Sequence, residues 1–270
     1  VLAQTFLNWE LIIVDNHSSD NTKTIVSRYR SQKIKFFQIH NHGVIAKSRN
    51  LGINRSRGKF VAFLDSDDYW DPRKLEKFLS LARFDQDFVY YHNCLLENGT
   101  SRKKIRCRQL KNNAFKDLIE NGNSLVASST VAPKSVLKEV NYFSEDVCFQ
   151  GWEDYHLWLK CAQNKVAFKF DSQFLGSLTR GTDNFDNPIQ ALKNLDNINK
   201  YFQMLSDKNV DHKRIWWIAY AKQIAKHEIG EHKKSVILGL AVLFNRSPYL
   251  FKAKSLIRIG RSVLQVILKS

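Results

Sequence analysis

Residues 58–72 read GKFVAFLDSDDYWDP, and this stretch decides the fold class. It begins with an apolar run of strand length, and three aspartates occupy the four positions that start at Asp65. Asp71 and Pro72 then indicate a helix start, because aspartate caps helices and proline suits the first helical turn. A buried strand that ends in carboxylates and leads into a helix is typical of α/β proteins.

The same pattern recurs along the first part of the chain. Residues 10–15, ELIIVD, form another apolar run that ends in an acid. Further strands are expected at 34–39 and 88–92, and helices at about 20–30, 44–55 and 72–84. Alternating strands and helices predict an α/β domain with a mostly parallel sheet. Ligands bind such sheets beyond the carboxyl ends of the strands, so Asp15 and Asp65 are expected to converge at one edge.

The composition indicates a folded and strongly basic protein. Hydrophobic residues make up 43% of the 270 positions, which excludes a disordered chain. Forty-two Lys and Arg against twenty-six Asp and Glu give a net charge of +16, which favours polyanionic partners such as nucleic acid, acidic membranes or phosphorylated substrates. A diffuse basic surface without a defined partner is the alternative. No apolar stretch reaches the roughly 18 residues that a membrane-spanning helix needs.

The charge is unevenly distributed. A largely helical, basic extension is expected over 186–270, after a first domain over 1–185. No acidic residue follows Glu231, whereas eight Lys or Arg do. A helical wheel of 250–269 separates a polar side (Lys254, Arg258, Arg261, Gln265, Lys269) from an apolar side (Leu256, Ile259, Val263, Val266, Ile267). This amphipathic helix predicts either packing on its own domain or contact with an anionic membrane surface.

Asp65-Ser66-Asp67 has two interpretations. Two carboxylates at a strand end can share Mg²⁺ or Mn²⁺, since such ions take one or two carboxylates together with substrate phosphates. The alternative is an ordinary turn, in which Asp and Ser are common. Taken alone, the pattern favours the turn.

Three ordered motifs change that interpretation. Residues 9–22, WELIIVDNHSSDNT, resemble the second strand of the family-2 glycosyltransferases and the segment after it. Residues 43–53, GVIAKSRNLGI, and residues 58–68, GKFVAFLDSDD, resemble the next two segments of that family. The resemblance implies an A-type glycosyltransferase fold, Rossmann-like with a mixed, mostly parallel sheet, and a nucleoside-diphosphate sugar as donor.

The resemblance also implies roles for individual residues. Asp15 would bond the nucleobase, Arg49 would lie near the base or diphosphate, and Asp65 would approach the ribose. Asp67, with Asp65, would hold Mg²⁺ or Mn²⁺. A buried structural Arg–Asp pair is the alternative for Arg49. Arg180 lies where some relatives place a basic residue near the phosphates.

A second constellation lies at 151–158, GWEDYHLW. A helix that starts here places Glu153 and Asp154 in its first turn, where the helix dipole favours carboxylates. The family carries a Glu-Asp pair at this place, and Asp154 resembles its general base, with Glu153 as the second candidate. Trp152 is expected either in an acceptor platform or in the core.

These patterns together predict an inverting glycosyltransferase that moves a sugar to a hydroxyl acceptor in bacterial surface polysaccharide or lipid-linked glycan synthesis. A cytoplasmic location is expected, with a peripheral position on the inner face of the cell membrane. The family's first strand is not found, and it would lie beside residues 11–15. An inactive truncated or degenerate fragment is therefore the alternative. A basic nucleic-acid-binding protein is a weaker alternative, and no nucleic acid partner is expected because no such module is recognised.

Overall fold

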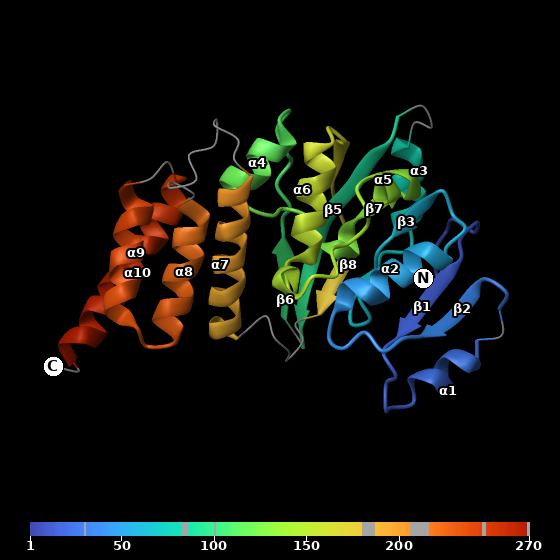
Figure 1. The fold of residues 1–270 in the computed structure, drawn as a ribbon, viewed down its shortest axis with the longest axis horizontal. Coiled ribbons are helices and arrows are strands. Elements are labelled where there is room, and N and C mark those ends of the chain that lie inside the picture. The colour runs from blue at the N-terminus through green and yellow to red at the C-terminus, as the bar shows by residue number, and fades with distance from the viewer. Residues whose placement is uncertain are drawn as a thin grey trace. The chain divides into compact units, whose positions relative to one another are not determined.

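The computed structural model describes residues 1–29, 31–82, 86–99, 101–179, 187–205, 216–244 and 247–268. The chain divides into two compact units, one of residues 1–114 with 124–181 and one of residues 115–123 with 182–270 (Figure 1). Residues 115–123, expected in the first domain, therefore belong with the helical second unit. The expected boundary after residue 185 lies outside the described residues.

Strands and helices alternate through most of the first unit. Its strands are β1 (Leu11–Asp15), β2 (Ile34–Gln38), β3 (Phe60–Ala62), β4 (Tyr69–Trp70), β5 (Phe88–Asn98), β6 (Ser101–Ile105), β7 (Val131–Pro133) and β8 (Ala167–Thr179). Its helices are α1 (Thr22–Ser27), α2 (Ile45–Arg55), α3 (Lys74–Leu81), α5 (Lys134–Glu139) and α6 (Glu153–Gln163), with short 3-10 turns η1 (Ala127–Ser129) and η2 (Val147–Phe149).

Most strands of the first unit form one mixed sheet. Its order is β3-β7-β5-β8-β4, and β6 pairs with β5. The predicted mixed sheet is confirmed. Among the described residues, β5 and β8 pair in parallel, whereas β3–β7, β4–β8, β5–β6 and β5–β7 are antiparallel.

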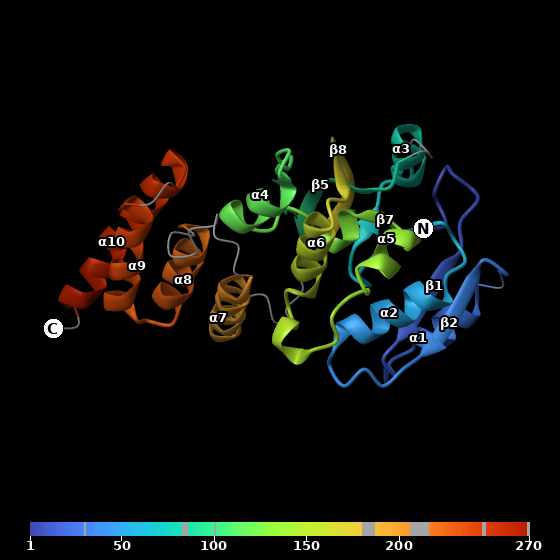
Figure 2. The same cartoon turned by 45° about the horizontal axis from the view of Figure 1, so that its top comes forward.

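The side chains of β3 and of the residue after it contact both faces of this sheet, because successive side chains on a strand point to opposite sides. Phe60 packs against Phe78 of α3, with ring centroids 4.9 Å apart. Three positions later, Phe63 meets Phe143 edge-on at 5.3 Å and also contacts Trp158 of α6. Helix α3 therefore covers one face, while α2, α5 and α6 lie on the other (Figures 1 and 2).

Strands β1 and β2 form a separate, parallel two-stranded sheet. Among the described residues, β1 pairs only with β2, and β3 pairs only with β7. No described strand pairs with both β1 and β3, so the sheet is interrupted between these two strands. Polar contacts tie the chain before β1 to the rest of the unit, since the buried amide of Gln4 donates to Asp71 O at 2.7 Å and accepts from Leu75 N at 3.0 Å.

The second unit contains five helices in its described residues. They are α4 (Ala114–Asn121), α7 (Pro188–Met204), α8 (Trp216–Glu228), α9 (His232–Phe244) and α10 (Tyr249–Leu268). Trp217 of α8 joins α4 to this unit, because its indole donates to Ile119 O at 2.8 Å. None of the helices described is long and apolar enough to cross a bilayer.

The side chains that α10 buries differ from the apolar side of the predicted helical wheel. Ile259 lies against Gly239 of α9, whereas Leu256 and Val263 of the same predicted apolar side are exposed. Lys269 and the side chain of Ile267 lie outside what the structure describes.

Candidate active site

Arg49 joins the two acidic motifs that the sequence singled out. Its Nη2 lies 2.8 Å from Asp65 Oδ1 and its Nη1 lies 2.6 Å from Glu153 Oε1. The residues are far apart in sequence, and they meet because α2 and α6 lie on the same face of the sheet as the end of β3. Burial alone would lower the pKa of Arg49, but the two carboxylates outweigh it and raise that pKa, so the side chain stays charged.

Glu153 and Asp154 have different surroundings although they are neighbours in the sequence. Glu153 is buried, and besides Arg49 its Oε2 accepts from Gly151 N at 2.8 Å. Asp154 accepts a hydrogen bond from Tyr155 N at 2.6 Å. Burial raises the pKa of Asp154 to about 7, Glu153 adds to the rise, and Arg49 opposes it. Asp154 is therefore the carboxylate whose pKa suits proton transfer near neutral pH, whereas Glu153 is held by Arg49.

Ser128 fixes the turn after β3. Its hydroxyl accepts from Asp65 N at 3.0 Å and is hydrogen-bonded to Asp68, whose pKa is raised by burial. Its carbonyl accepts from Trp70 Nε1 at 2.9 Å and from the fully buried Lys74 Nζ at 2.7 Å. One buried serine thus holds both ends of the turn that carries Asp67.

Sequence reasoning missed Ser128 and Lys74. A signal was available for Lys74, since a lysine in the first turn of a helix opposes the helix dipole and indicates a local constraint. No sequence signal marks Ser128, because its role depends on a backbone carbonyl and on contacts across 54 to 63 positions.

Replacing Ser128 by alanine is expected to lower the free energy of unfolding by about 1–3 kcal/mol, because Asp65 N and the Asp68 carboxylate each lose a buried partner. Ser129→Ala is the matched control. Ser129 is equally buried, but its hydroxyl donates only to Val126 O, which keeps the backbone bond from Ser129 N. Urea denaturation of the two variants measures the difference, and equal losses would contradict this role of Ser128.

Asp67 is exposed and forms no hydrogen bond or ion pair with the residues described. No cluster of three or more His, Cys, Asp or Glu side chains among those residues could hold a metal ion by itself. The donor set nevertheless fits Mg²⁺ or Mn²⁺, since such ions take one or two carboxylates and complete their shell with water and phosphate oxygens. Asp67 offers an unpaired carboxylate for this purpose, and Asp65 offers the oxygen that Arg49 does not bind.

Asp15 lies at the end of β1 in its own network. Burial opposes its ionisation, but hydrogen bonds from Ser18 and Gln38 outweigh it and hold its pKa below the usual value. The expected convergence of Asp15 and Asp65 does not appear as a contact between described residues, since their strands belong to different sheets. Beside Asp15, the exposed imidazoles of His17 and His40 stack with centroids 3.8 Å apart, which sequence reasoning did not predict.

Trp152 is 4% exposed, and its indole donates to Cys148 O at 2.8 Å. It packs against Phe149, with centroids 4.9 Å apart. Of the two roles left open for Trp152, this geometry favours packing that shapes the start of α6. Arg180 lies outside the described residues.

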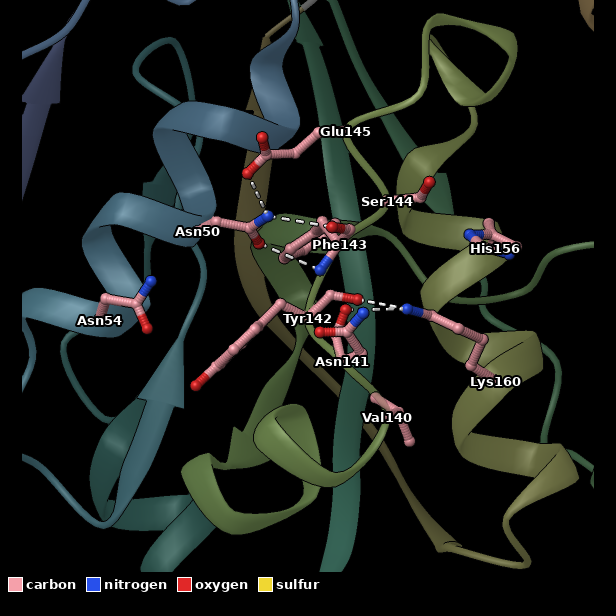
Figure 3. Close-up of a pocket in the computed structure, with 10 residues that line it drawn as sticks. All are labelled: Asn50, Asn54, Val140, Asn141, Tyr142, Phe143, Ser144, Glu145, His156 and Lys160. Atoms are coloured by element: carbon pink, nitrogen blue, oxygen red, sulfur yellow. Dashed lines mark hydrogen bonds between the residues drawn. The ribbon is translucent and has the colours of Figure 1, made fainter.

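A polar pocket of about 530 Å³ opens between α2, α6 and the loop after α5 (Figure 3). Asn50 holds that loop from one side, with bonds of 2.9 Å to Phe143 O and 3.0 Å from Phe143 N, and Lys160 donates to Tyr142 O from the other. The pocket contains none of the predicted site residues. Phe143 lines this pocket and also contacts Arg49 of the ion pairs, whose guanidinium lies 5.4 Å from the Phe143 ring centroid.

Comparison with known families identifies the family of the chain. The model of "Glycosyl transferase family 2" matches residues 1–140, which is more than half of the chain. The chain belongs to this family. The match includes Asp15, Arg49, Asp65 and Asp67 and ends before Glu153 and Asp154.

Curated relatives of this family-2 chain are bacterial and archaeal glycosyltransferases. It is 32% identical over 181 residues to the Escherichia coli UDP-Glc:alpha-D-GlcNAc-diphosphoundecaprenol beta-1,3-glucosyltransferase WfgD, a match that covers 67% of this chain and 68% of WfgD. It is 31% identical over 206 residues to an uncharacterised glycosyltransferase of Rickettsia conorii, which covers 74% of this chain. The chain spans only a third of the length of that Rickettsia protein.

Solved structures show the same fold. Staphylococcus aureus TarS in complex with UDP-GlcNAc superimposes with a TM-score of 0.57 at 18% identity, over 96% of this chain and 82% of the TarS chain. The TarS complex with UDP gives a TM-score of 0.53 over 99% of this chain and 85% of the other. The family-2 chain therefore has the predicted A-type glycosyltransferase fold.

Proposed function

We propose that this family-2 chain transfers a sugar from a nucleoside-diphosphate sugar to a hydroxyl acceptor with inversion at the anomeric carbon. The Arg49 bridge carries the proposal, because one buried guanidinium fixes the end of β3 and the start of α6 relative to each other. This bridge supports a single site in which Asp65 and Asp67 would serve the donor phosphates and Asp154 the acceptor proton. Asp15, at the end of β1, would bond the nucleobase.

The proposed reaction is a single displacement. The acceptor hydroxyl oxygen forms a bond to the anomeric carbon while the bond to the donor diphosphate breaks. Asp154 takes the hydroxyl proton, and its raised pKa makes it a base matched to neutral pH. Asp67 and Asp65 would hold Mg²⁺ or Mn²⁺, which when bound neutralises negative charge on the diphosphate.

The acceptor class is proposed from the relatives. WfgD and WfaP, both from Escherichia coli, are named for transfer to GlcNAc-diphosphoundecaprenol, a lipid-linked acceptor. We propose a lipid-linked or surface glycan acceptor for this chain too, which implies work in the cytoplasm at the inner face of the cell membrane. Trp152, by shaping the start of α6, would support the acceptor side indirectly.

A second candidate is a chain that binds the donor without transferring its sugar. The interruption between β1 and β3 favours it, because Asp15 and Asp65 then sit on sheets that no strand pairing joins among the described residues. Donor binding alone does not distinguish the two candidates.

A thermal-shift panel of UDP-, GDP- and TDP-sugars with and without Mn²⁺ tests both proposals. We expect one nucleotide to raise the Tm in the presence of Mn²⁺, because a ligand that binds only the folded state stabilises it. Turnover of that donor with a polyprenyl-diphosphate sugar acceptor would support transfer. A Tm shift without turnover would support the second candidate, and no shift with any donor would contradict both.

A further inference from the structure

The helices α9 and α10 pack through small polar side chains. Ser235, Ser255 and Ser262 have no exposed surface. The Ser255 hydroxyl donates to Gln223 Oε1 of α8 at 2.9 Å, and the Ser262 hydroxyl donates to Ser235 Oγ at 3.3 Å. Gly239 permits the close approach, since a Cβ there would lie 2.6 Å from Ile259. The contact between α9 and α10 therefore uses few of the aliphatic side chains of these two helices.

Those aliphatic side chains point outward instead. On α10, Leu256, Ile257, Val263 and Leu264 are between 40% and 60% exposed. They recur at spacings of seven residues, so they form one stripe along the helix. On the neighbouring α9, Ile237 is 67% exposed and Leu240 43% exposed. Single exposed aliphatic residues are ordinary, but a stripe of them along one helix, with two more on the neighbouring helix, indicates an interaction surface.

The charge around this face identifies the kind of partner. No acidic side chain occurs between His232 and Leu268. Lys254 and Arg261 are exposed on α10, each about one helical turn before Ile257 and Leu264 respectively. Lys233 and Lys234 are exposed in the first turn of α9, where Lys234 pairs with Glu231 at 2.8 Å. Aliphatic residues bordered by cations match a bilayer with anionic headgroups, where the apolar side chains enter the acyl boundary and the cations meet phosphates.

We propose that the outward faces of α9 and α10 bind the surface of an anionic lipid bilayer. Ile237, Leu240, Leu256, Ile257, Val263 and Leu264 enter the interface, and Lys254 and Arg261 contact the headgroups. The helices lie on the membrane, since no described helix could span it. This inference rests on the second unit alone and does not depend on the proposed sugar transfer.

Vesicle sedimentation of the full chain tests the proposal. We expect binding to vesicles in which about a third of the lipid is phosphatidylglycerol, and a loss of roughly a hundredfold in affinity for Ile257→Asp/Leu264→Asp, about tenfold for each aliphatic side chain withdrawn from the interface. The matched control is Ile189→Asp/Met204→Asp on α7, which adds the same charge at two apolar positions of the same unit that are 58% and 78% exposed. Equal binding losses in both double variants would overturn the proposal, because the loss would then reflect net charge alone.

Two further measurements complete the test. Lys254→Glu/Arg261→Glu is expected to abolish the preference for phosphatidylglycerol over pure phosphatidylcholine vesicles, and an unchanged preference would contradict the cationic contact. Light scattering tests the alternative that this face binds a second copy of the chain. A wild-type dimer that Ile257→Asp/Leu264→Asp converts to a monomer, without vesicle binding by either protein, would assign the face to a second copy and refute the bilayer. Circular dichroism must show unchanged helix content in each variant.

Discussion

Replacing Asp154 by asparagine is expected to lower the rate of sugar transfer by about a hundredfold to ten-thousandfold, the range typical of losing a general base. Asparagine keeps the size of the side chain and its bond from Tyr155 N, but it cannot accept the acceptor proton. Donor binding should be unchanged, because Arg49 still joins Asp65 to Glu153. The rate is measured as turnover, and donor binding as the Tm shift in Mn²⁺.

The stability of Asp154→Asn distinguishes the loss of the base from misfolding. The pKa of Asp154 rises from its ordinary 3.8 to about 7 in the folded chain, so the folded state binds this proton more tightly than the unfolded state. Asp154 therefore costs stability as the pH rises from about 4 to about 7, and that cost is complete above pH 7. Asp154→Asn should then be at least as stable as the wild type at pH 8, and an unstable variant would contradict the buried-carboxylate geometry.

The same pKa predicts the pH dependence of the wild type. Transfer should rise roughly tenfold per pH unit up to about pH 7 and then level off, because only the ionised carboxylate is a base. A flat profile between pH 5 and pH 8, at rates limited by chemistry, would assign the base elsewhere.

Replacing Asp67 by alanine is expected to abolish the Mn²⁺-dependent part of donor binding. Asp67 has no partner among the described residues, so the free energy of unfolding without ligand should change by less than about 0.5 kcal/mol. The measurement is the Tm shift that the nucleotide sugar produces with Mn²⁺ and with EDTA. In Asp67→Ala the two shifts should be equal.

Glu139→Ala is the control for Asp67→Ala. Glu139 is another exposed carboxylate of the first unit, at the end of α5 and outside the ion-pair site. This variant should keep the full Mn²⁺-dependent shift. A normal shift in Asp67→Ala would remove the metal role from this aspartate, even if Asp154→Asn behaves as expected.

The sequence predicted the motifs of the site better than their contacts. Strands ending at Asp15 and near Asp65 were readable because buried strands give continuous apolar runs. The pairing of Arg49 was left open between a donor contact and a structural ion pair. The structure shows an ion pair with two carboxylates, one of them 104 positions away, which local patterns do not encode.

The pairing of the strands shows the same limit of local sequence patterns. The five-residue β1 and the eleven-residue β5 have enough length for a pattern, whereas β4 has two residues and β7 has three. Such short strands carry no periodicity, so their antiparallel pairing was not predictable. On α10, the helical wheel identified an apolar side, but the helix packs through Ser255 and Ser262, and only tertiary contacts reveal which side faces inward.

The interruption between β1 and β3 bears on how the donor would be held. Among the described residues no strand pairs with both β1 and β3, so β1 and β2 are expected to open locally at a lower free energy than the sheet centred on β5 and β8. A nucleotide sugar that contacts Asp15 through its base and Asp65 through its ribose would bridge the two sheets. Part of its binding free energy would be used to order β1 and β2, which lowers its affinity relative to a preorganised site. A bound donor would then stabilise the fold as well as serve as the substrate of the reaction.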